Sequence, residues 1–199
     1  MGLKRDQQAA EKAAKRAALA TALGDIVLAE GLEAFSLRPL AARLGTSDRM
    51  LLYYFGTKAA LIADTLASVS QRLATSLSSA SSSSPRSTPR EVIGIAVDLL
   101  AGPDANPFMA LWAEIVARAV RGDAVFQGVV DRTMGAWSDW IVARTEFPAG
   151  VDPARSAAAM LAVIEGISTF GLLGADVGDL VSALLDAVTP PQRLPSRRE

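Results

Sequence analysis

The 199-residue chain contains no cysteine and no histidine. Without cysteine it has no disulfide and no thiolate for a metal site, which leaves the redox compartment undetermined. Without histidine it lacks the commonest metal ligand and the commonest general base. No GxGxxG or GxxxxGK[ST] phosphate-binding sequence is present, and the remaining carboxylates, lysines, tyrosines and serines form no recognisable catalytic group. We therefore predict a protein that is not an enzyme and uses neither a metal nor a cofactor.

The chain also has little that predicts a membrane or an export pathway. Its charged start has no apolar core of a secretory signal, and Asp6 departs from the myristoylation pattern. The longest apolar run, residues 157–175, is interrupted by Glu165 and contains several small residues. Such a run is more typical of a buried bundle helix than of a membrane span. We expect a cytoplasmic protein.

Half of the residues are hydrophobic, and no long alternation of β-branched residues is present, which predicts an all-α fold. The net charge is −1, but it is unevenly distributed. Residues 1–58 contain nine Lys or Arg and six Asp or Glu, whereas the remainder contains eleven and fifteen. A basic head on an acidic body is typical of a small DNA-reading module attached to a larger domain. Ordinary scatter of charge is the alternative.

The stretch from Ser36 to Lys58 predicts two short helices joined by a tight turn. Ser36 is a candidate N-cap, and apolar residues follow at helical spacing up to Leu44. Gly45 supplies the positive φ that ends this helix, and Thr46-Ser47 caps the next. This is the helix-turn-helix arrangement, which places its second helix in the DNA major groove.

The second helix of this motif is predicted from Asp48 to Tyr54, and Gly56-Thr57 ends it. Its outer surface is predicted to carry Asp48, Arg49 and Tyr53. On its inner side we expect Leu51, Leu52 and Phe55 to pack against the core. Lys58 then begins a longer helix.

The rest of the chain is dominated by helical periodicity. A first helix over about 6–30 has an apolar stripe of Leu19, Ala22, Leu23, Ile26 and Val27, and Gly31 ends it. Later helices are predicted near 57–77, 91–101, 106–121, 124–147, 152–173 and 176–188, with a flexible Ser- and Pro-rich loop at 76–90. We expect an N-terminal DNA-binding domain at 1–58, a C-terminal helical domain at 59–189 and a polar tail at 190–199.

Residues 16–66 resemble the N-terminal domain of the TetR family of bacterial transcriptional regulators. The spacing from Gly31 to Gly45, Phe55 and Lys58 fits this family without gaps, and the residues that carry the match are Arg16, Leu19, Ala22, Ser36, Leu37, Arg38, Leu40, Ala41, Leu44, Ser47, Leu51, Tyr53 and Leu61. Departures from the family pattern are Pro39, Leu52 where Tyr is usual, and the Asp48-Arg49 pair. They bear on the preferred DNA sequence more than on the fold.

The resemblance implies a role for each polar residue of the motif. Arg38, Asp48 and Arg49 are the candidates for reading bases, because a guanidinium donates two hydrogen bonds to guanine. Asp48 either accepts from a cytosine amine, caps the helix, or orients Arg49. Phosphate contacts are assigned to Arg16, Ser47, Tyr53, Tyr54 and Lys58. The preceding cations Lys4, Arg5, Lys12 and Lys15 form either a solvated face or an arm that reaches DNA.

The C-terminal domain is predicted to have two functions. The last two helices are unusually apolar and contain the small residues Ala157, Ala158, Gly166 and Gly171. By the resemblance they form a homodimer interface, as a palindromic operator requires; an internal core is the alternative.

An effector pocket is predicted among Phe108, Trp112, Phe126, Met134, Trp137 and Trp140, although aromatic residues at helical spacing are more often plain core. The acids Glu114, Asp131 and Glu165 would favour a cationic or polar ligand if they face inward.

The sequence thus predicts a ligand-responsive regulator that binds a palindromic operator as a homodimer and acts as a repressor. Double-stranded DNA and an unidentified small molecule are its expected partners. The competing functions are a DNA-compacting protein that is indifferent to sequence, and a helical ligand-binding protein or enzyme without DNA reading.

Overall fold

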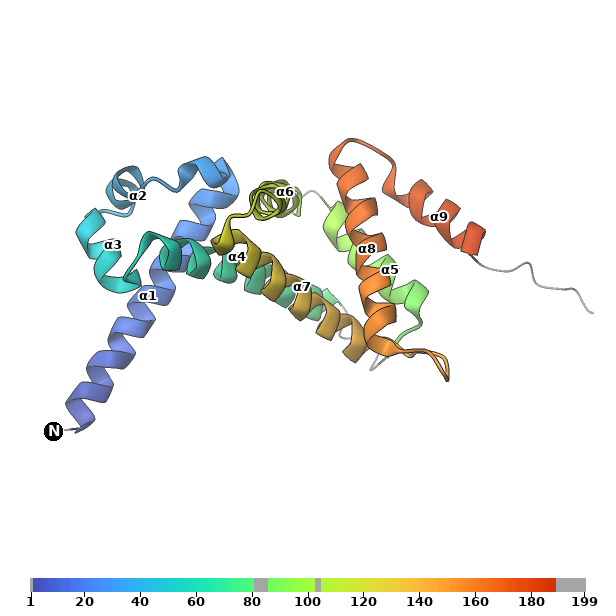
Figure 1. Ribbon diagram of the computed structural model, residues 1–199, viewed down its shortest axis with the longest axis horizontal. Coiled ribbons are helices and arrows are strands. Elements are labelled where there is room, and N and C mark those ends of the chain that lie inside the picture. The colour runs from blue at the N-terminus through green and yellow to red at the C-terminus, as the bar shows by residue number, and fades with distance from the viewer. Residues whose placement is uncertain (1, 81–85, 103–104, 189–199) are drawn as a thin grey trace, which may run out of the picture.

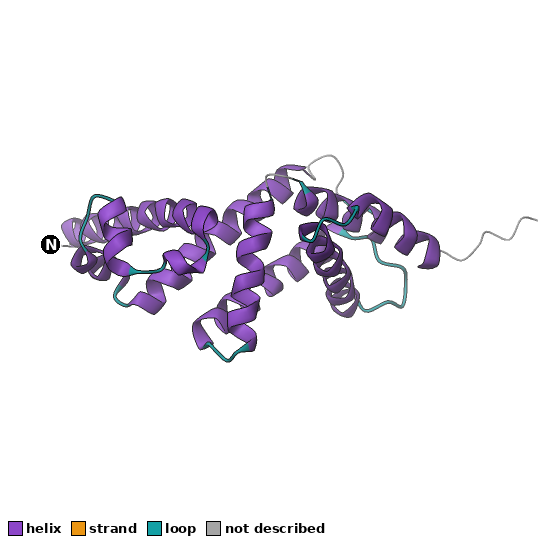
Figure 2. Ribbon diagram, turned by 90° about the horizontal axis from the view of Figure 1, so that it is seen from above, coloured by secondary structure: helices purple, strands orange, loops and turns teal. Residues whose placement is uncertain are grey.

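The computed structural model describes residues 2–80, 86–102 and 105–188. Within these residues the chain forms nine α-helices, one short 3₁₀ helix and no strand beyond an isolated bridge between Ser87 and Thr145 (Figures 1 and 2). The elements are α1 (Gly2–Glu30), the 3₁₀ helix η1 (Leu32–Ala34), α2 (Leu37–Arg43), α3 (Asp48–Phe55), α4 (Lys58–Ala80), α5 (Pro89–Ala101), α6 (Asn106–Val120), α7 (Ala124–Arg144), α8 (Pro153–Leu172) and α9 (Val177–Val188). The predicted all-α fold is confirmed.

The helices gather at the two ends of an elongated molecule, and the long helices α4 and α7 connect them (Figure 1). One core unites α1–α4 with parts of α6 and α7, and its best-buried members include Leu23, Leu51 and Leu61. The second core packs α5, α7 and α8 around Ile141 and Ile164. Because α4, α6 and α7 contribute to the packing between the ends, the helix-turn-helix is attached to the body through buried side chains.

Helices α1 and α4 run in the same direction and are joined by two ion pairs of opposite polarity. Arg16 of α1 pairs with Asp64 of α4, and Asp25 of α1 accepts from Arg72 of α4 at 2.5 Å. Surface pairs of this kind contribute about 0.2–1 kcal/mol each. Their main effect is on register, because they hold the first helix against the helix that leads into the body.

Local sequence signals set most helix ends. Gly45 has a φ of +62°, as predicted for the end of α2. Ser47 Oγ accepts from Met50 N at 3.2 Å, and Asp152 Oδ1 accepts from Ala154 N at 3.0 Å. Ser36 occupies the predicted N-cap position of α2, but its side chain makes no capping hydrogen bond.

The predicted loop at 76–90 is shorter than expected. Helix α4 continues to Ala80, and α5 begins at Pro89 behind a capping box in which Thr88 and Glu91 exchange hydrogen bonds. These bonds lower the pKa of the Glu91 carboxyl, because they stabilise its charged form. The Ser-rich part of the predicted loop, 81–85, and the predicted tail at 190–199 lie outside the described residues.

Candidate DNA interface and ligand cavity

The helix-turn-helix is held together by a small set of buried side chains. Leu40 and Ala41 of α2 and Leu51 and Phe55 of α3 are each at most 3% exposed. The turn is closed by Thr46 N, which donates to the carbonyl of Ala41 at 2.9 Å. This packing fixes α3 against α2 and leaves the opposite side of α3 to solvent.

The exposed side of α3 carries most of the predicted base-reading residues. Asp48 and Arg49 are exposed, and Arg38 is exposed at the start of α2. The prediction that Leu52 packs inward is wrong, since its side chain is 38% exposed. Leu52 lies four residues after Asp48, one helical turn along the same outer face. It therefore takes a place on the candidate DNA surface.

Asp48 makes a local contact that bears on its three proposed roles. Its Oδ1 accepts from the backbone N–H of Arg49 at 2.9 Å. A carboxylate at this position stabilises the positive N-terminus of α3. Asp48 thus satisfies one free N–H of the first turn of α3, while Ser47 is the N-cap residue, and the second carboxylate oxygen of Asp48 has no hydrogen bond among the described residues.

The predicted phosphate-binding residues fall into two groups. Ser47 and Lys58 are exposed, and Tyr53 is 58% exposed. Arg16 pairs with Asp64, and Tyr54 is half-buried with its ring edge-on to that of Tyr53. Ser47, Tyr53 and Lys58 are therefore directly accessible to a ligand. Arg16 reaches a phosphate only if its guanidinium leaves the Asp64 carboxylate or contacts both groups at once.

Lys12, one of the cations for which the sequence predicts either a solvated face or an arm that reaches DNA, lies beside α3. Its Nζ is 4.2 Å from the centre of the Tyr53 ring, a cation–π contact. The positive end of α1 is therefore held against the recognition helix. Sequence spacing gives no signal for this contact, because forty residues separate its two members.

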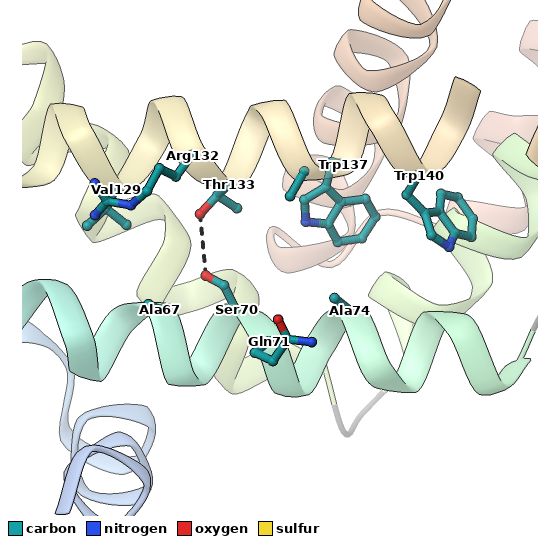
Figure 3. A pocket seen from close by; sticks show the side chains of 10 residues that line it. Ala67, Ser70, Gln71, Ala74, Val129, Arg132, Thr133, Trp137 and Trp140 are labelled. Atoms are coloured by element: carbon teal, nitrogen blue, oxygen red, sulfur yellow. Dashed lines mark hydrogen bonds between the residues drawn. The ribbon is translucent and has the colours of Figure 1, made fainter. Parts of the chain in front are cut away.

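A cavity of about 180 Å³ lies between α4 and α7 (Figure 3). Trp137 and Trp140 point into this region from α7, and the small residues Ala67 and Ala74 leave space on α4. At its centre a hydrogen bond of 3.3 Å joins the hydroxyls of Ser70 and Thr133. An apolar cleft with a few polar groups is the usual form of a small-molecule site.

A second recess of about 40 Å³ adjoins the first. Ser70, Thr133 and Trp137 line both, and the other residues that line the second include Phe108, Trp112 and Glu165. Trp112 Nε1 donates to Glu165 Oε2 at 2.8 Å. Burial raises the pKa of the Glu165 carboxyl above its ordinary value of 4.5, and the hydrogen bond from Trp112 partly opposes this shift.

Four of the six predicted pocket residues line these two spaces: Phe108, Trp112, Trp137 and Trp140. The other two do not, because Phe126 is 5% exposed in the first core and Met134 packs against the second. Glu165 is the acid that faces inward, whereas Asp131 is exposed. Glu114 instead accepts from the backbone N–H of Leu32 at 2.8 Å and joins α6 to the N-terminal domain.

Helix α8 is apolar on a side that the chain itself does not cover. In the described part of the chain it is the one helix long and apolar enough to cross a membrane, and a third of its apolar window is buried. Phe170 is 58% and Leu173 79% exposed. Of the small residues expected at an interface, Ala158 and Gly166 are exposed, Ala157 is buried in the chain's own core and Gly171 faces Val177 of α9.

Comparison with known proteins agrees with this architecture. Residues 26–65 match the model of the bacterial regulatory proteins of the tetR family. No curated protein matches the chain. Among solved structures, a protein from Rhodococcus sp. described as a TetR-family transcriptional regulator is 23% identical, with a TM-score of 0.68 over 86% of this chain and 95% of its own.

Two further structures are similar over nearly the whole chain. A transcriptional regulator from Rhodococcus sp. Rha1 is 21% identical, with a TM-score of 0.64 over 88% of this chain and 98% of its own. A protein from Saccharomonospora viridis, described as a transcriptional regulator in complex with choline, is 18% identical, with a TM-score of 0.63 over 89% and 96%. The chain thus has the all-helical fold of these solved regulators, with an N-terminal helix-turn-helix. Its residues 26–65 match the model of the tetR family.

Proposed function

We propose that the protein is a ligand-responsive transcriptional regulator that binds a palindromic operator as a homodimer and represses transcription. The observation that carries this proposal is the outer face of α3, where Arg49 is exposed and forms no ion pair with any acid among the described residues. A guanidinium presented in this way by the second helix of a helix-turn-helix suits bidentate contact with guanine.

The proposed DNA contacts divide into reading and positioning groups. Arg38 and Arg49, with Asp48, read base edges. Phosphates are bound, and the register on the DNA is set, by Ser47, Tyr53, Tyr54 and Lys58. Arg16 joins them when its guanidinium contacts a phosphate as well as the Asp64 carboxylate.

The proposed homodimer uses α8 and α9. A two-fold axis would bring the exposed Phe170 and Leu173 of each protomer against its partner, and the exposed Ala158 and Gly166 allow close helix approach. Both recognition helices of such a dimer would face one side of the DNA, as two half-sites of a palindrome require.

The proposed effector site is the pair of adjoining cavities between α4, α6, α7 and α8. The similar regulator from Saccharomonospora viridis is in complex with choline, which supports a small-molecule ligand for this fold. Because α4 also packs with the helix-turn-helix, a ligand that displaces α4 from α7 would change the separation of the two recognition helices. By linkage, such a ligand weakens operator binding by the same factor that the operator weakens ligand binding.

The test is selection of bound DNA from a random oligonucleotide pool at moderate salt, followed by binding of variants to the recovered sequence. We expect a palindrome that is bound roughly a thousandfold more tightly than random DNA. Arg49→Ala should cost about 1–3 kcal/mol and relax the preference at one base pair, whereas Lys58→Ala should weaken all sequences equally and make the salt dependence shallower.

Arg43 supplies a matched control, because it is also an arginine of the motif but pairs with Glu30 and is not among the proposed base contacts. Arg43→Ala should leave the recovered motif unchanged. Recovery of no motif, with strongly salt-dependent affinity for every sequence, would instead identify a DNA-compacting protein.

A further inference from the structure

The carboxyl group of Glu165 lies in an aromatic recess without a cation opposite it. Its described hydrogen-bond partner is Trp112 Nε1, and none of the ion pairs formed by the described residues includes it. A carboxylate accepts about four hydrogen bonds, so one indole N–H leaves most of its capacity unused. The charged form of a partly buried carboxyl with so few partners is unfavourable, and a cationic ligand beside it would stabilise that form.

The rings around this carboxyl favour a positive group. Phe108, Trp112 and Trp137 line the same recess, and the faces of aromatic rings attract ammonium and guanidinium groups. Carboxylate and rings together therefore attract a cation, whereas an anion is repelled by both.

Arg132 and Arg144, which contact the larger cavity or a residue that lines it, form no ion pair with Glu165 in the described part of the chain. Arg132 lines the larger cavity, but its side chain extends back along α7 toward Val129 (Figure 3). Its Nη1 lies 3.4 Å from the position of a Cβ on Gly128, one turn before it. Arg144 lies over the ring of Trp140, 5.8 Å from its centre, at the other end of the cavity. The recess beside Glu165 thus keeps its negative character.

The two spaces also define a shape. The recess has a volume of about 40 Å³, and a single water occupies about 10–15 Å³ of such a volume. The recess therefore accepts a head group of a few heavy atoms. The adjoining space of 180 Å³ is bounded largely by alanine, valine and tryptophan side chains and suits an apolar tail. Ser70 and Thr133 lie where the two meet.

We propose that the effector is an organic cation, an alkyl amine or alkyl quaternary ammonium, whose charged head binds Glu165 and whose apolar tail lies between α4 and α7. This ligand class presupposes the ligand-responsive function proposed above. Glu165 gives the site its preference for charge, and the rings of Trp112 and Trp137 enclose the head.

The experiment compares three probes of matched chain length: hexylammonium, hexan-1-ol and hexanoate. Binding to the full-length protein at pH 7.5 is followed by calorimetry and by tryptophan fluorescence, since two of the three tryptophans line the recess. Hexylammonium should bind about tenfold or more tightly than hexanol, which is roughly 1.4 kcal/mol, and hexanoate should bind most weakly. Equal affinity for hexanol and hexylammonium, or no binding of hexylammonium at millimolar concentration, would overturn the proposal.

The variant Glu165→Gln retains an acceptor for Trp112 and removes the charge. It should lose the preference for hexylammonium while keeping the wild-type affinity for hexanol, which also reports that the cavity is intact. Asp131→Asn is the matched control, because this carboxyl is exposed and lines neither cavity; it should bind all three probes like the wild type. A preference for the cation that survives in Glu165→Gln would contradict the role of Glu165.

Operator selection without any ligand separates this proposal from the regulatory function. A protein that recovers a palindrome but binds hexanol and hexylammonium equally contradicts the ligand class alone. A protein that prefers hexylammonium through Glu165 but selects no DNA contradicts the regulatory function alone.

Discussion

Glu114 of α6 accepts a hydrogen bond from Leu32 of η1, directly after Gly31. We expect any substitution of Gly31 to destabilise the protein. Gly31 has φ +73° and ψ −169°, a region that is essentially restricted to glycine. A Cβ at this position would lie 2.5 Å from Glu114 Oε1 and 3.0 Å from Oε2. The same carboxylate accepts from Leu32 N at 2.8 Å. Substitution therefore strains the backbone and displaces the acceptor of a cross-domain hydrogen bond.

The expected magnitudes follow from these two effects. The backbone strain of Gly31→Ala costs about 1–3 kcal/mol. Loss of the hydrogen bond from Leu32 adds about 1 kcal/mol, the value of an ordinary hydrogen bond rather than of one to a buried charge, because Glu114 is exposed to solvent. We therefore expect Gly31→Ala to lower the free energy of unfolding by about 2–4 kcal/mol and Glu114→Ala by about 1 kcal/mol.

The double variant gives the decisive measurement. Once Glu114 is gone, Gly31→Ala has no carboxylate to displace, so the double variant should be about as stable as Gly31→Ala alone. The free energy of unfolding is measured in urea at one fixed protein concentration, because a dimer makes stability concentration-dependent. Full additivity of the two single effects would refute the reasoning.

Gly45 is the matched control for this cycle. It also has a positive φ, +62°, but a Cβ there would meet nothing within 4 Å. Gly45→Ala should cost about 1–2 kcal/mol from backbone conformation alone. Its effect should add to that of Glu114→Ala without coupling.

Two further predictions concern single residues. Leu51 is fully buried, so Leu51→Ala should lower the free energy of unfolding in urea by about 2–5 kcal/mol. Leu52 lies on the exposed face, so Leu52→Ala should lower it by less than about 1 kcal/mol. Equal losses would contradict the described rotation of α3. The raised pKa of Glu165 means that its contribution to stability is present below the pKa of the unfolded chain and is lost as pH rises through the folded value. Without ligand, Glu165→Gln should thus gain stability relative to the wild type as pH rises above the ordinary carboxyl pKa of 4.5, and a difference independent of pH would count against this environment.

Much of the fold could be predicted from local patterns. Apolar spacing at three and four residues located the helices, and Gly31, Gly45 and Asp152 marked helix boundaries through backbone and capping chemistry. The errors have local explanations. The apolar side chain of Leu52 predicts a core position, although this residue lies one helical turn after the exposed Asp48 on α3. The composition of the Ser-rich stretch predicts a loop from residue 76, although α4 continues to Ala80.

The candidate sites depended on contacts that periodicity does not encode. The aromatic residues of the middle helices are all plausible core or pocket residues in one dimension. Packing distinguishes them, since Phe126 enters the first core while Trp112 and Trp137 border the recess beside Glu165. The pairing of Arg16 with Asp64 likewise arises because α1 and α4 lie side by side.

The sequence by itself determined the helical class, the helix-turn-helix and the exposure of Asp48, Arg49 and Tyr53 on its second helix, because these depend on interactions within a few residues of each other. Only the tertiary structure decided which carboxylate faces the aromatic recess, which carboxylate joins α6 to the N-terminal domain, and which apolar face of α8 stays uncovered. These depend on how helices far apart in the chain rotate and pack, and each rotation is set by the summed burial of all its neighbours rather than by the helix's own pattern.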